Sequence, residues 1–302
     1  MIEEAALLQI GRALKASGYA FTAITPESHR HVLARHLEAI DTRAVFGWNR
    51  PFSADALPIE LFQALQKADA VHRQADRYIS LVRFATLYDE VYLHSGFPTE
   101  RQDAVFFGPD TYRYARLLRQ HVVSARRVID VGCGSGAGAL CLQDRVDQIC
   151  LADINAQALQ YARINAKLAG ISERVETAHS DVLNGVQGEF DLVISNPPYM
   201  VDEAERAYRH GGALLGAELS VRIVREGLAH LAAGGKLVLY TASAIVDGVD
   251  TFWHAIQPLL REQRYDVWYE EIDPDVFGEE LQRPAYQRVD RLAVVGLVVQ
   301  TT

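Results

Sequence analysis

The tetrapeptide at positions 196–199, Asn-Pro-Pro-Tyr, combines residue types that can act on a planar amino group. The apolar run at 190–195 predicts a buried strand, and two prolines directly after it would end that strand and hold the next carbonyl groups rigid. The amide oxygen of Asn196 and the carbonyl of Pro197 can both accept hydrogen bonds from one NH₂ group. These bonds would pull the nitrogen toward tetrahedral geometry and free its lone pair for attack, while Tyr199 offers an aromatic face for stacking.

A glycine-rich stretch lies upstream, between an apolar run and a helical pattern. It runs from Asp130 to Gly138 and reads Asp-Val-Gly-Cys-Gly-Ser-Gly-Ala-Gly, which predicts a strand, a tight turn and a helix N-terminus whose unpaired N–H groups face a ligand. Gly132, Gly134 and Ala137 also satisfy the dinucleotide fingerprint, so NAD binding and a purely structural turn are alternatives. Asp130 favours a ligand with an amino-acid moiety, because its carboxylate could bind an ammonium group but would repel a pyrophosphate.

Two more acids follow predicted strands. Asp153 ends the apolar run at 148–153 and lies about 20 residues beyond Gly132, where a carboxylate can accept hydrogen bonds from both ribose hydroxyls of a nucleoside. Asp181 and Val182 follow the next predicted strand, where an adenine ring is usually held between an acceptor and an apolar side chain. A structural turn is the competing interpretation of Asp181. These residues indicate a nucleoside ligand without distinguishing NAD from S-adenosylmethionine (SAM).

Together these motifs resemble those of class I SAM-dependent methyltransferases of the HemK/PrmC type, over roughly residues 97–300. The resemblance implies SAM as the cofactor, bound by a set that comprises Asp130, Gly132, Gly134, Gly136, Asp153, Asp181, Val182 and Asn196. It implies Asn196, Pro197 and Tyr199 as the catalytic residues. They would act by positioning and preorganised dipoles, with no metal ion and no general base, because the sulfonium of SAM is already a strong electrophile.

The identity of the methyl acceptor is less constrained. HemK/PrmC enzymes methylate the glutamine of the Gly-Gly-Gln motif in release factors, which makes a protein glutamine the favoured acceptor. The same N-P-P-Y motif occurs in adenine-N6 DNA methyltransferases, and close variants occur in guanine-N2 rRNA enzymes, so a nucleic-acid base is an alternative, as is a small-molecule amine. The release-factor enzymes also carry a P-R-P-E-T-E-like segment, where this chain has Gly-Pro-Asp-Thr at 108–111.

The charge of the chain bears on this choice. The formal net charge is −9, and the excess of acids lies in residues 121–302. A protein that grips nucleic acid normally shows a basic face, and none is evident, so we expect a protein or small-molecule partner rather than nucleic acid. A non-catalytic nucleoside sensor is the alternative from another class of function, but such a protein has no use for an intact N-P-P-Y motif.

The spacing of the motifs predicts the architecture. Strands alternate with helices from residue 96 to 302, which indicates an α/β, doubly wound Rossmann-like sheet; by resemblance it has seven strands, the last one antiparallel. Residues 1–95 predict a smaller, mainly helical domain with one short hairpin at 78–84 and 90–94, which could recognise a substrate or shape one wall of the site. A helix is expected at 25–40.

A connector at 97–111 joins the two predicted domains. Its place just before the first strand of the catalytic domain makes Phe106, Phe107 and Thr111 candidates to cover the methionine end of the cofactor. A purely structural linker is an equally good interpretation.

Composition excludes several other classes of protein. The chain has 302 residues, 49% of them hydrophobic and 23% charged, which is typical of a globular protein. No signal peptide and no membrane-spanning run is visible, so we expect a cytoplasmic protein with reduced structural cysteines. No acid or cysteine completes a metal site around His29, His31 and His36. The sequence does not indicate an oligomeric state.

Overall fold

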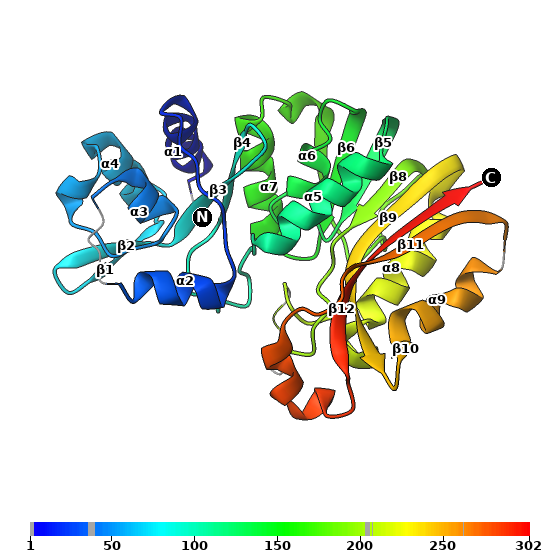
Figure 1. The fold of residues 1–302 in the computed structure, drawn as a ribbon. Coiled ribbons are helices and arrows are strands. Elements are labelled where there is room, and N and C mark those ends of the chain that lie inside the picture. Colours follow the sequence, from blue (N-terminus) through cyan, green and yellow to red (C-terminus); the bar gives the residue numbers. More distant parts are fainter. Residues whose placement is uncertain (1–2, 36–39, 203–205, 207, 262) are drawn as a thin grey trace.

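The computed structural model describes residues 3–35, 40–202, 206, 208–261 and 263–302 (Figure 1). Its largest element is a twisted sheet with the strand order β11-β12-β9-β8-β5-β6-β7. These strands are β5 (Ala125–Val131), β6 (Val146–Asp153), β7 (Val175–His179), β8 (Phe190–Ser195), β9 (Leu231–Val246), β11 (Tyr265–Asp273) and β12 (Arg291–Thr301). Strands β5 to β9 pair in parallel, and β12 runs antiparallel to both of its neighbours. The predicted doubly wound sheet is confirmed; the two-residue β10 (Val249–Asp250) is an addition that pairs with β9.

Helices cover both faces of this sheet. Side chains of the parallel strands alternate between two apolar clusters, as Val128 and Ile129 show: the first packs with residues of α5, α6 and α7, and the second with residues of α8 and α9. The helices are α5 (Pro109–His121), α6 (Ala137–Leu140), α7 (Ala156–Leu168), α8 (Glu218–Ala229) and α9 (Thr251–Leu260). Short 3₁₀ turns complete the connections: η1 (Ala54–Ala56), η2 (Ser172–Arg174), η3 (Leu214–Gly216), η4 (Gly278–Gln282) and η5 (Pro284–Tyr286).

The register of the parallel strands brings their carboxyl ends to one edge. Val131 at the end of β5 pairs with Ser195 at the end of β8 and with Ala152 near the end of β6. Asp153 in turn pairs with His179 at the end of β7. The residues that follow these strands therefore leave the sheet side by side, at the edge where ligands bind in open α/β sheets.

The N-terminal part has more strand structure than the sequence predicted. It contains α1 (Glu4–Ala16), α2 (Pro26–Leu33), α3 (Thr42–Phe46), α4 (Ile59–Lys67) and two hairpins, β1–β2 (Val71–Gln74, Arg77–Ser80) and β3–β4 (Val82–Leu87, Glu90–Ser95). The strand expected at 78–84 is interrupted at Leu81, whose N–H donates to Ala70. The division of the chain at residue 95 stays a prediction.

Helix α2 begins as expected and ends early. Thr25 caps it by accepting a hydrogen bond from the N–H of Ser28, and Pro26 occupies the first turn. The last helical residue is Leu33, not Ile40. Near this end, the guanidinium of Arg50 donates a hydrogen bond to the carbonyl of Val32 at 3.0 Å. The expectation for His36 lies outside the described residues. No helix of the described chain is long and apolar enough to cross a membrane.

His29 of α2 belongs to a buried cluster of polar side chains. His29 is 1% exposed, and its ring nitrogens contact the carbonyl of Trp48 at 2.9 Å and the guanidinium of Arg83 at 3.4 Å. Arg83 also donates to the carbonyl of Gly47. Burial and the nearby Arg83 charge lower the pKa of His29 to about 4, so the imidazole is neutral in the folded protein.

This lowered pKa predicts acid sensitivity. The unfolded chain binds a proton at this histidine below about pH 6.5, whereas the folded protein does so only near pH 4. Stability should therefore fall as the pH drops through this window, by about 3 kcal/mol from His29. Urea unfolding of the wild type and of His29→Gln at pH 7.5 and 4.5 measures this contribution; equal losses in the two proteins would contradict it.

Candidate active site

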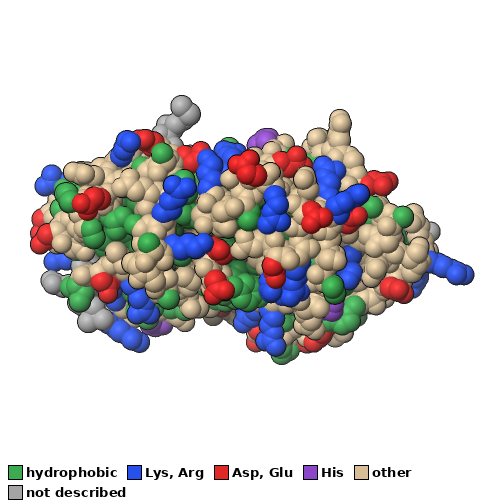
Figure 2. Space-filling model, turned by 90° about the horizontal axis from the view of Figure 1, so that it is seen from above, with side chains coloured by type: hydrophobic (Ala, Val, Ile, Leu, Met, Phe, Trp, Pro, Cys, Tyr) green, Lys and Arg blue, Asp and Glu red, His purple; other side chains and the backbone are tan. Residues whose placement is uncertain are grey.

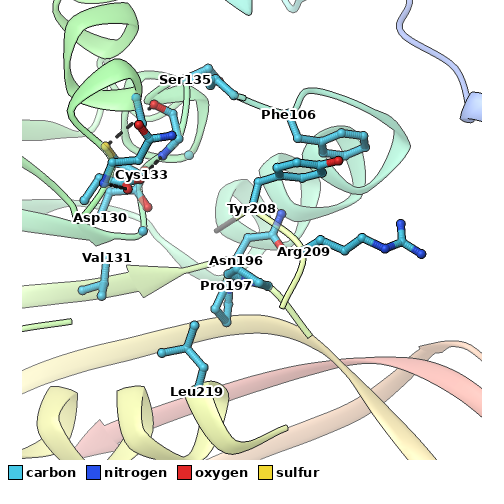
Figure 3. A pocket seen from close by; sticks show the side chains of 18 of the residues that line it. Phe106, Asp130, Val131, Cys133, Ser135, Asn196, Pro197, Tyr208, Arg209 and Leu219 are labelled. Atoms are coloured by element: carbon cyan, nitrogen blue, oxygen red, sulfur yellow. Dashed lines mark hydrogen bonds between the residues drawn. The ribbon is translucent and has the colours of Figure 1, made fainter. Parts of the chain in front are cut away.

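A cavity of about 250 Å³ lies at the carboxyl ends of β5, β6, β7 and β8 (Figure 3). Its wall contains the glycine-rich turn, the residues after β6 and β7, and the segment after β8. The residues that the sequence singled out and that line the cavity are Phe106, Thr111, Asp130, Gly132, Gly134, Asp153, Asp181, Val182, Asn196, Pro197 and Tyr199. The strand register explains how motifs so far apart in sequence meet here.

The glycines of the turn have two different roles. Gly132 and Gly134 line the cavity with φ of +68° and +53°, and a Cβ atom on either would meet no atom within 4 Å. Their open backbone leaves room for a ligand. Gly136 is not part of the wall: it is the N-cap of α6, with φ of +78°, and a Cβ there would lie 3.3 Å from the side chain of Ala162 in α7.

Asp130 is almost fully buried below this turn. It is 2% exposed, and its Oδ2 accepts a hydrogen bond from the N–H of Ala139 at 3.0 Å. Burial raises the pKa of this carboxyl group to about 7. Gly138 makes the arrangement possible, since a Cβ there would come within 2.7 Å of Oδ2 and 2.6 Å of the Tyr114 ring. A cationic group in the cavity would favour the ionised form of Asp130.

Asp153 is held by the backbone at the end of β6. Its two carboxylate oxygens accept hydrogen bonds from the N–H groups of Gly134 at 2.9 Å and Asn155 at 2.8 Å, and burial raises its pKa. The next residue, Ile154, also lines the cavity and is 56% exposed. The sequence motifs did not point to Ile154, although an apolar side chain directly after an acid that ends a strand is a local signal.

Asp181 and Val182 lie at the far end of the cavity wall. The carboxylate of Asp181 is half exposed and pairs with the guanidinium of Arg222 at 2.8 Å. Val182 is buried with a positive φ of 54°. A ligand that donates a hydrogen bond to Asp181 must therefore share this carboxylate with the guanidinium of Arg222.

Asn196 stands at the centre of the site. In Figure 3 its side chain lies between the Asp130 side of the cavity and the rings of Phe106 and Tyr208, with Pro197 directly beside it. It is half-buried, and no other residue in the described chain hydrogen-bonds to its side-chain amide. The amide oxygen therefore remains available to a ligand. The strand before it is fixed by Ser195, whose hydroxyl donates to the carbonyl of Val131 at 2.6 Å.

The Tyr199 ring is held in a buried polar environment. It is 9% exposed, and burial together with the nearby Asp110 carboxylate raises its pKa well above the usual value. Asp110 is itself 6% exposed and accepts a hydrogen bond from the Tyr240 hydroxyl at 3.0 Å. The phenol is therefore neutral, and this ring can only be a fixed surface or a hydrogen-bonding partner.

An aromatic pair closes the cavity on the side of the connector. The rings of Phe106 and Tyr208 are nearly parallel, with centroids 6.2 Å apart, and the Tyr208 hydroxyl donates to the carbonyl of Thr99. Phe107, also considered for this position, instead packs in the core against His94. Nothing in the sequence pointed to Tyr208, because it belongs to no helix or strand and to none of the recognised motifs.

A cysteine also lies in the cavity wall. Cys133 is 6% exposed, and burial, with the negative charges of Asp153 and Asp130, raises the pKa of its thiol well above the usual value. Among the described residues, no group of three or more His, Cys, Asp and Glu side chains could hold a metal ion.

The loop that follows Tyr208 supports the backbone of the N-P-P-Y segment. The N–H of Met200 donates to Arg209, and the N–H of Gly211 donates back to Met200 at 2.8 Å. A Cβ on Gly211 would lie 2.8 Å from the carbonyl oxygen of Pro198, and one on Gly216 would lie 2.4 Å from that of Tyr199. Only glycine allows these two backbones to approach so closely.

Comparison with known proteins places the chain in a family. The family described as "Methyltransferase small domain" matches residues 102–267. Among solved structures, Trm5b of Pyrococcus abyssi has a TM-score of 0.53 at 14% identity, covering 82% of this chain and 68% of that one, a likeness of fold alone.

Three curated relatives differ in the acceptor that their names state. Release factor glutamine methyltransferase of Deinococcus radiodurans is 33% identical over 171 residues, covering 52% of this chain and 57% of the relative. The tRNA1(Val) (adenine(37)-N6)-methyltransferase of Aeromonas hydrophila is 34% identical, covering 42% and 56%. Ribosomal RNA small subunit methyltransferase C of Chromohalobacter salexigens is 35% identical, covering 38% and 31%. The chain thus spans little more than half the length of these relatives, or less.

The close contact between Gly216 and Tyr199 predicts how a methyl group added at position 216 changes the stability of the protein. Gly216 and Gly234 both have a positive φ, of 95° and 74°, so replacement by alanine strains either backbone. Only at Gly216 does the new Cβ also collide with backbone, since Gly234 has no atom within 4 Å. Gly216→Ala should therefore lower the free energy of unfolding by about 2 kcal/mol more than Gly234→Ala. Urea titration measures both; equal losses would show that the contact is easily relieved.

Proposed function

We propose that the chain, which belongs to the methyltransferase small domain family, acts as a SAM-dependent methyltransferase. It transfers the methyl group of SAM to a planar amide or aromatic amino nitrogen, with a protein glutamine as the favoured acceptor. The observation that carries this proposal is the half-buried Asn196 amide, free of partners within the described chain, in the wall of the cavity that the glycine-rich turn also lines.

The donor set of the cavity fits SAM. Asp130 would bind the ammonium of the methionine moiety, and the open backbone at Gly132 and Gly134 lets that moiety approach. Asp153 would accept the ribose hydroxyls, since its carboxylate is already oriented by two backbone N–H groups. Asp181, Val182 and the exposed Ile154 would hold the adenine ring, and Thr111 would lie at the methionine end.

The chain's own residues then act on the acceptor nitrogen. When bound, SAM supplies an electrophilic methyl group on a sulfonium. Asn196 and the Pro197 carbonyl accept hydrogen bonds from the acceptor NH₂ and localise its lone pair, and the fixed Tyr199 ring supports the planar group. Gly211 and Gly216 hold the backbone of this segment in position. The nitrogen–methyl bond forms as the methyl–sulfur bond breaks, and the methylated nitrogen then releases a proton to solvent. The transfer therefore requires neither a base nor a metal ion.

The charges around the site support a protein or small-molecule acceptor. Arg209, the arginine of the cavity wall, pairs with the buried Glu280 at 2.5 Å. Arg206 pairs with Asp202 at 2.5 Å, and Arg113 lies between two aspartates. These cations are neutralised and poorly suited to bind phosphates. On the face seen in Figure 2, acidic and basic side chains are interspersed rather than gathered by sign.

A nucleic-acid base is the second candidate acceptor. The relatives named for tRNA and ribosomal RNA and the stacked pair of Phe106 and Tyr208 favour it, because a base could stack on such rings. Transfer of a tritiated methyl group from SAM into a fractionated lysate separates the candidates. Label in a protein fraction supports the proposal, and label only in RNA or DNA overturns the choice of acceptor while leaving the transfer chemistry intact.

The proposed role of Asn196 predicts a separation of binding from turnover. Asn196→Ala removes one of the two acceptors, and loss of such a preorganised group typically costs 10²- to 10³-fold in rate. Labelled methyl transfer should fall by at least about 100-fold, while the Kd for SAM in calorimetry changes by about twofold or less. Unchanged transfer in this variant would refute the mechanism. Asn196→Asp, which keeps an acceptor oxygen in place, is the matched comparison.

The raised pKa of Asp130 predicts a pH dependence of cofactor binding. Its carboxyl group is protonated below about pH 7 in the free protein, and it must ionise to bind an ammonium group. The Kd for SAM should therefore fall about tenfold per unit as the pH rises from 5.5 toward 7, with release of a proton. Calorimetry in two buffers measures both effects. In Asp130→Asn the slope should be absent; a slope that persists would assign the proton to another group.

A further inference from the structure

Helix α7 stands between the N-terminal part of the chain and the large sheet (Figure 1). One of its faces, with Tyr161, Ile164 and Leu168, belongs to the same apolar cluster as α1 and β4. The opposite face, with Leu159 and Ala162, packs against residues of the sheet. The contact with α1 is close, because a Cβ on Gly11 would come within 2.6 Å of Leu168.

One polar side chain of α7, Asn165, connects these two parts. It is 1% exposed. Its Nδ2 donates to the carbonyl of Leu93 in β4 at 3.1 Å and to the carbonyl of Ser135 at 2.9 Å, and its Oδ1 accepts from the N–H of Leu93 at 2.8 Å. Both donors and one acceptor position of the amide are thereby used. The side chain pairs with the edge of β4 as a neighbouring strand would.

Ser135 belongs to the glycine-rich turn at 132–136, which we call the cofactor turn. It is 4% exposed, lines the cavity, and lies between Gly134 and Gly136. The turn is held at Gly134 by the Asp153 carboxylate and at Gly136 by packing on α7. Backbone bonds from the N–H groups of Gly132 and Cys133 to the carbonyl of Ala152 also hold it. The bond from Asn165 to Ser135 is a further attachment, and it leads directly to the N-terminal hairpin.

We propose that Asn165 couples the β3–β4 hairpin to the cofactor turn. The hairpin then helps to hold the turn in the conformation that binds SAM, and bound SAM stabilises the hairpin in return. Asn165 is a positioning residue, since it acts through Ser135. The proposal rests on SAM as the cofactor but not on the identity of the acceptor, so it is tested by SAM binding alone.

The energetics favour coupling over a merely local role. Loss of the amide would leave three buried backbone groups without their partners, namely the N–H and carbonyl of Leu93 and the carbonyl of Ser135. An isolated two-stranded hairpin is marginally stable, so β4 depends on this edge contact. Since any coupling between two sites is reciprocal, a ligand that fixes the turn must also oppose opening of the hairpin.

Asn165→Ala tests the first half of the proposal, with Asn49→Ala as a matched control. Asn49 is also buried in the N-terminal part, at 2% exposed, and also bonds to backbone on two sides, through Ser80 and Phe97, but it does not touch the turn. We expect both variants to lower the Tm, and only Asn165→Ala to raise the Kd for SAM, by about tenfold, in calorimetry well below either Tm. An unchanged Kd in Asn165→Ala, or an equal rise in Asn49→Ala, would overturn the coupling.

Two further measurements test the proposal even if Asn165→Ala does not fold. Asn165→Asp keeps the acceptor for the N–H of Leu93 but loses both donor bonds, to the carbonyls of Leu93 and Ser135, so it should bind SAM more weakly than the wild type. In the wild type, saturating SAM should slow hydrogen exchange of the Leu93 amide at least fivefold, with less effect on Ile79 in the β1–β2 hairpin. Protection of the turn without protection of Leu93 would refute the proposal.

Discussion

The site depends on the register between β5 and β8. Val131 and Ser195 are paired and joined by the Ser195 hydroxyl, so Gly132 and Asn196 leave the sheet at the same level. A slip of one residue would turn the side chains of β8 to the other face and move Asn196 with them. The apolar side chains that alternate between the two core clusters oppose such a slip. The packing of the sheet therefore sets the distance between the glycine-rich turn and the N-P-P-Y segment.

The two buried aspartates, Asp130 and Asp153, lie at the same edge of the sheet but differ in the kind of ligand group that each can bind. Asp130 has a single backbone donor at its carboxylate and a pKa near 7, so it gains most from a cation. Asp153 receives two backbone donors, which favour its ionised form against the effect of burial. The first is suited to an ammonium group and the second to neutral hydroxyls. Neighbouring positions in one cavity thus differ through the number of N–H groups aimed at each.

The parts of the structure that could be predicted from the sequence are those with strong local signals. The alternating strands and helices, the glycine-rich turn and the acids after β6 and β7 each follow from a few adjacent residues. The N-terminal hairpins were harder, because their strands are short and β2 and β3 are separated by a single residue. Tyr208 and Asn165 could not be predicted, since their partners are set by tertiary packing: Tyr208 lies outside every helix and strand, and Asn165 resembles any polar residue on a helix.

Gly136 and Phe107 illustrate a second limit. Each belongs to a stretch whose neighbours line the cavity, yet both side-chain positions face packed structure instead. A motif identifies a segment, whereas the rotation of the backbone decides which members of the segment reach the ligand. That rotation depends on α6, α7 and the core beneath the connector, which carry no local signature.

The thiol of Cys133 has a consequence for the durability of the protein. A thiolate is a strong nucleophile, and this sulfur lies in the wall of a cavity built for a reactive methyl donor. Burial and two neighbouring carboxylates keep it protonated. Burial and the same negative charges that favour a cationic donor thereby keep this sulfur in its less nucleophilic form.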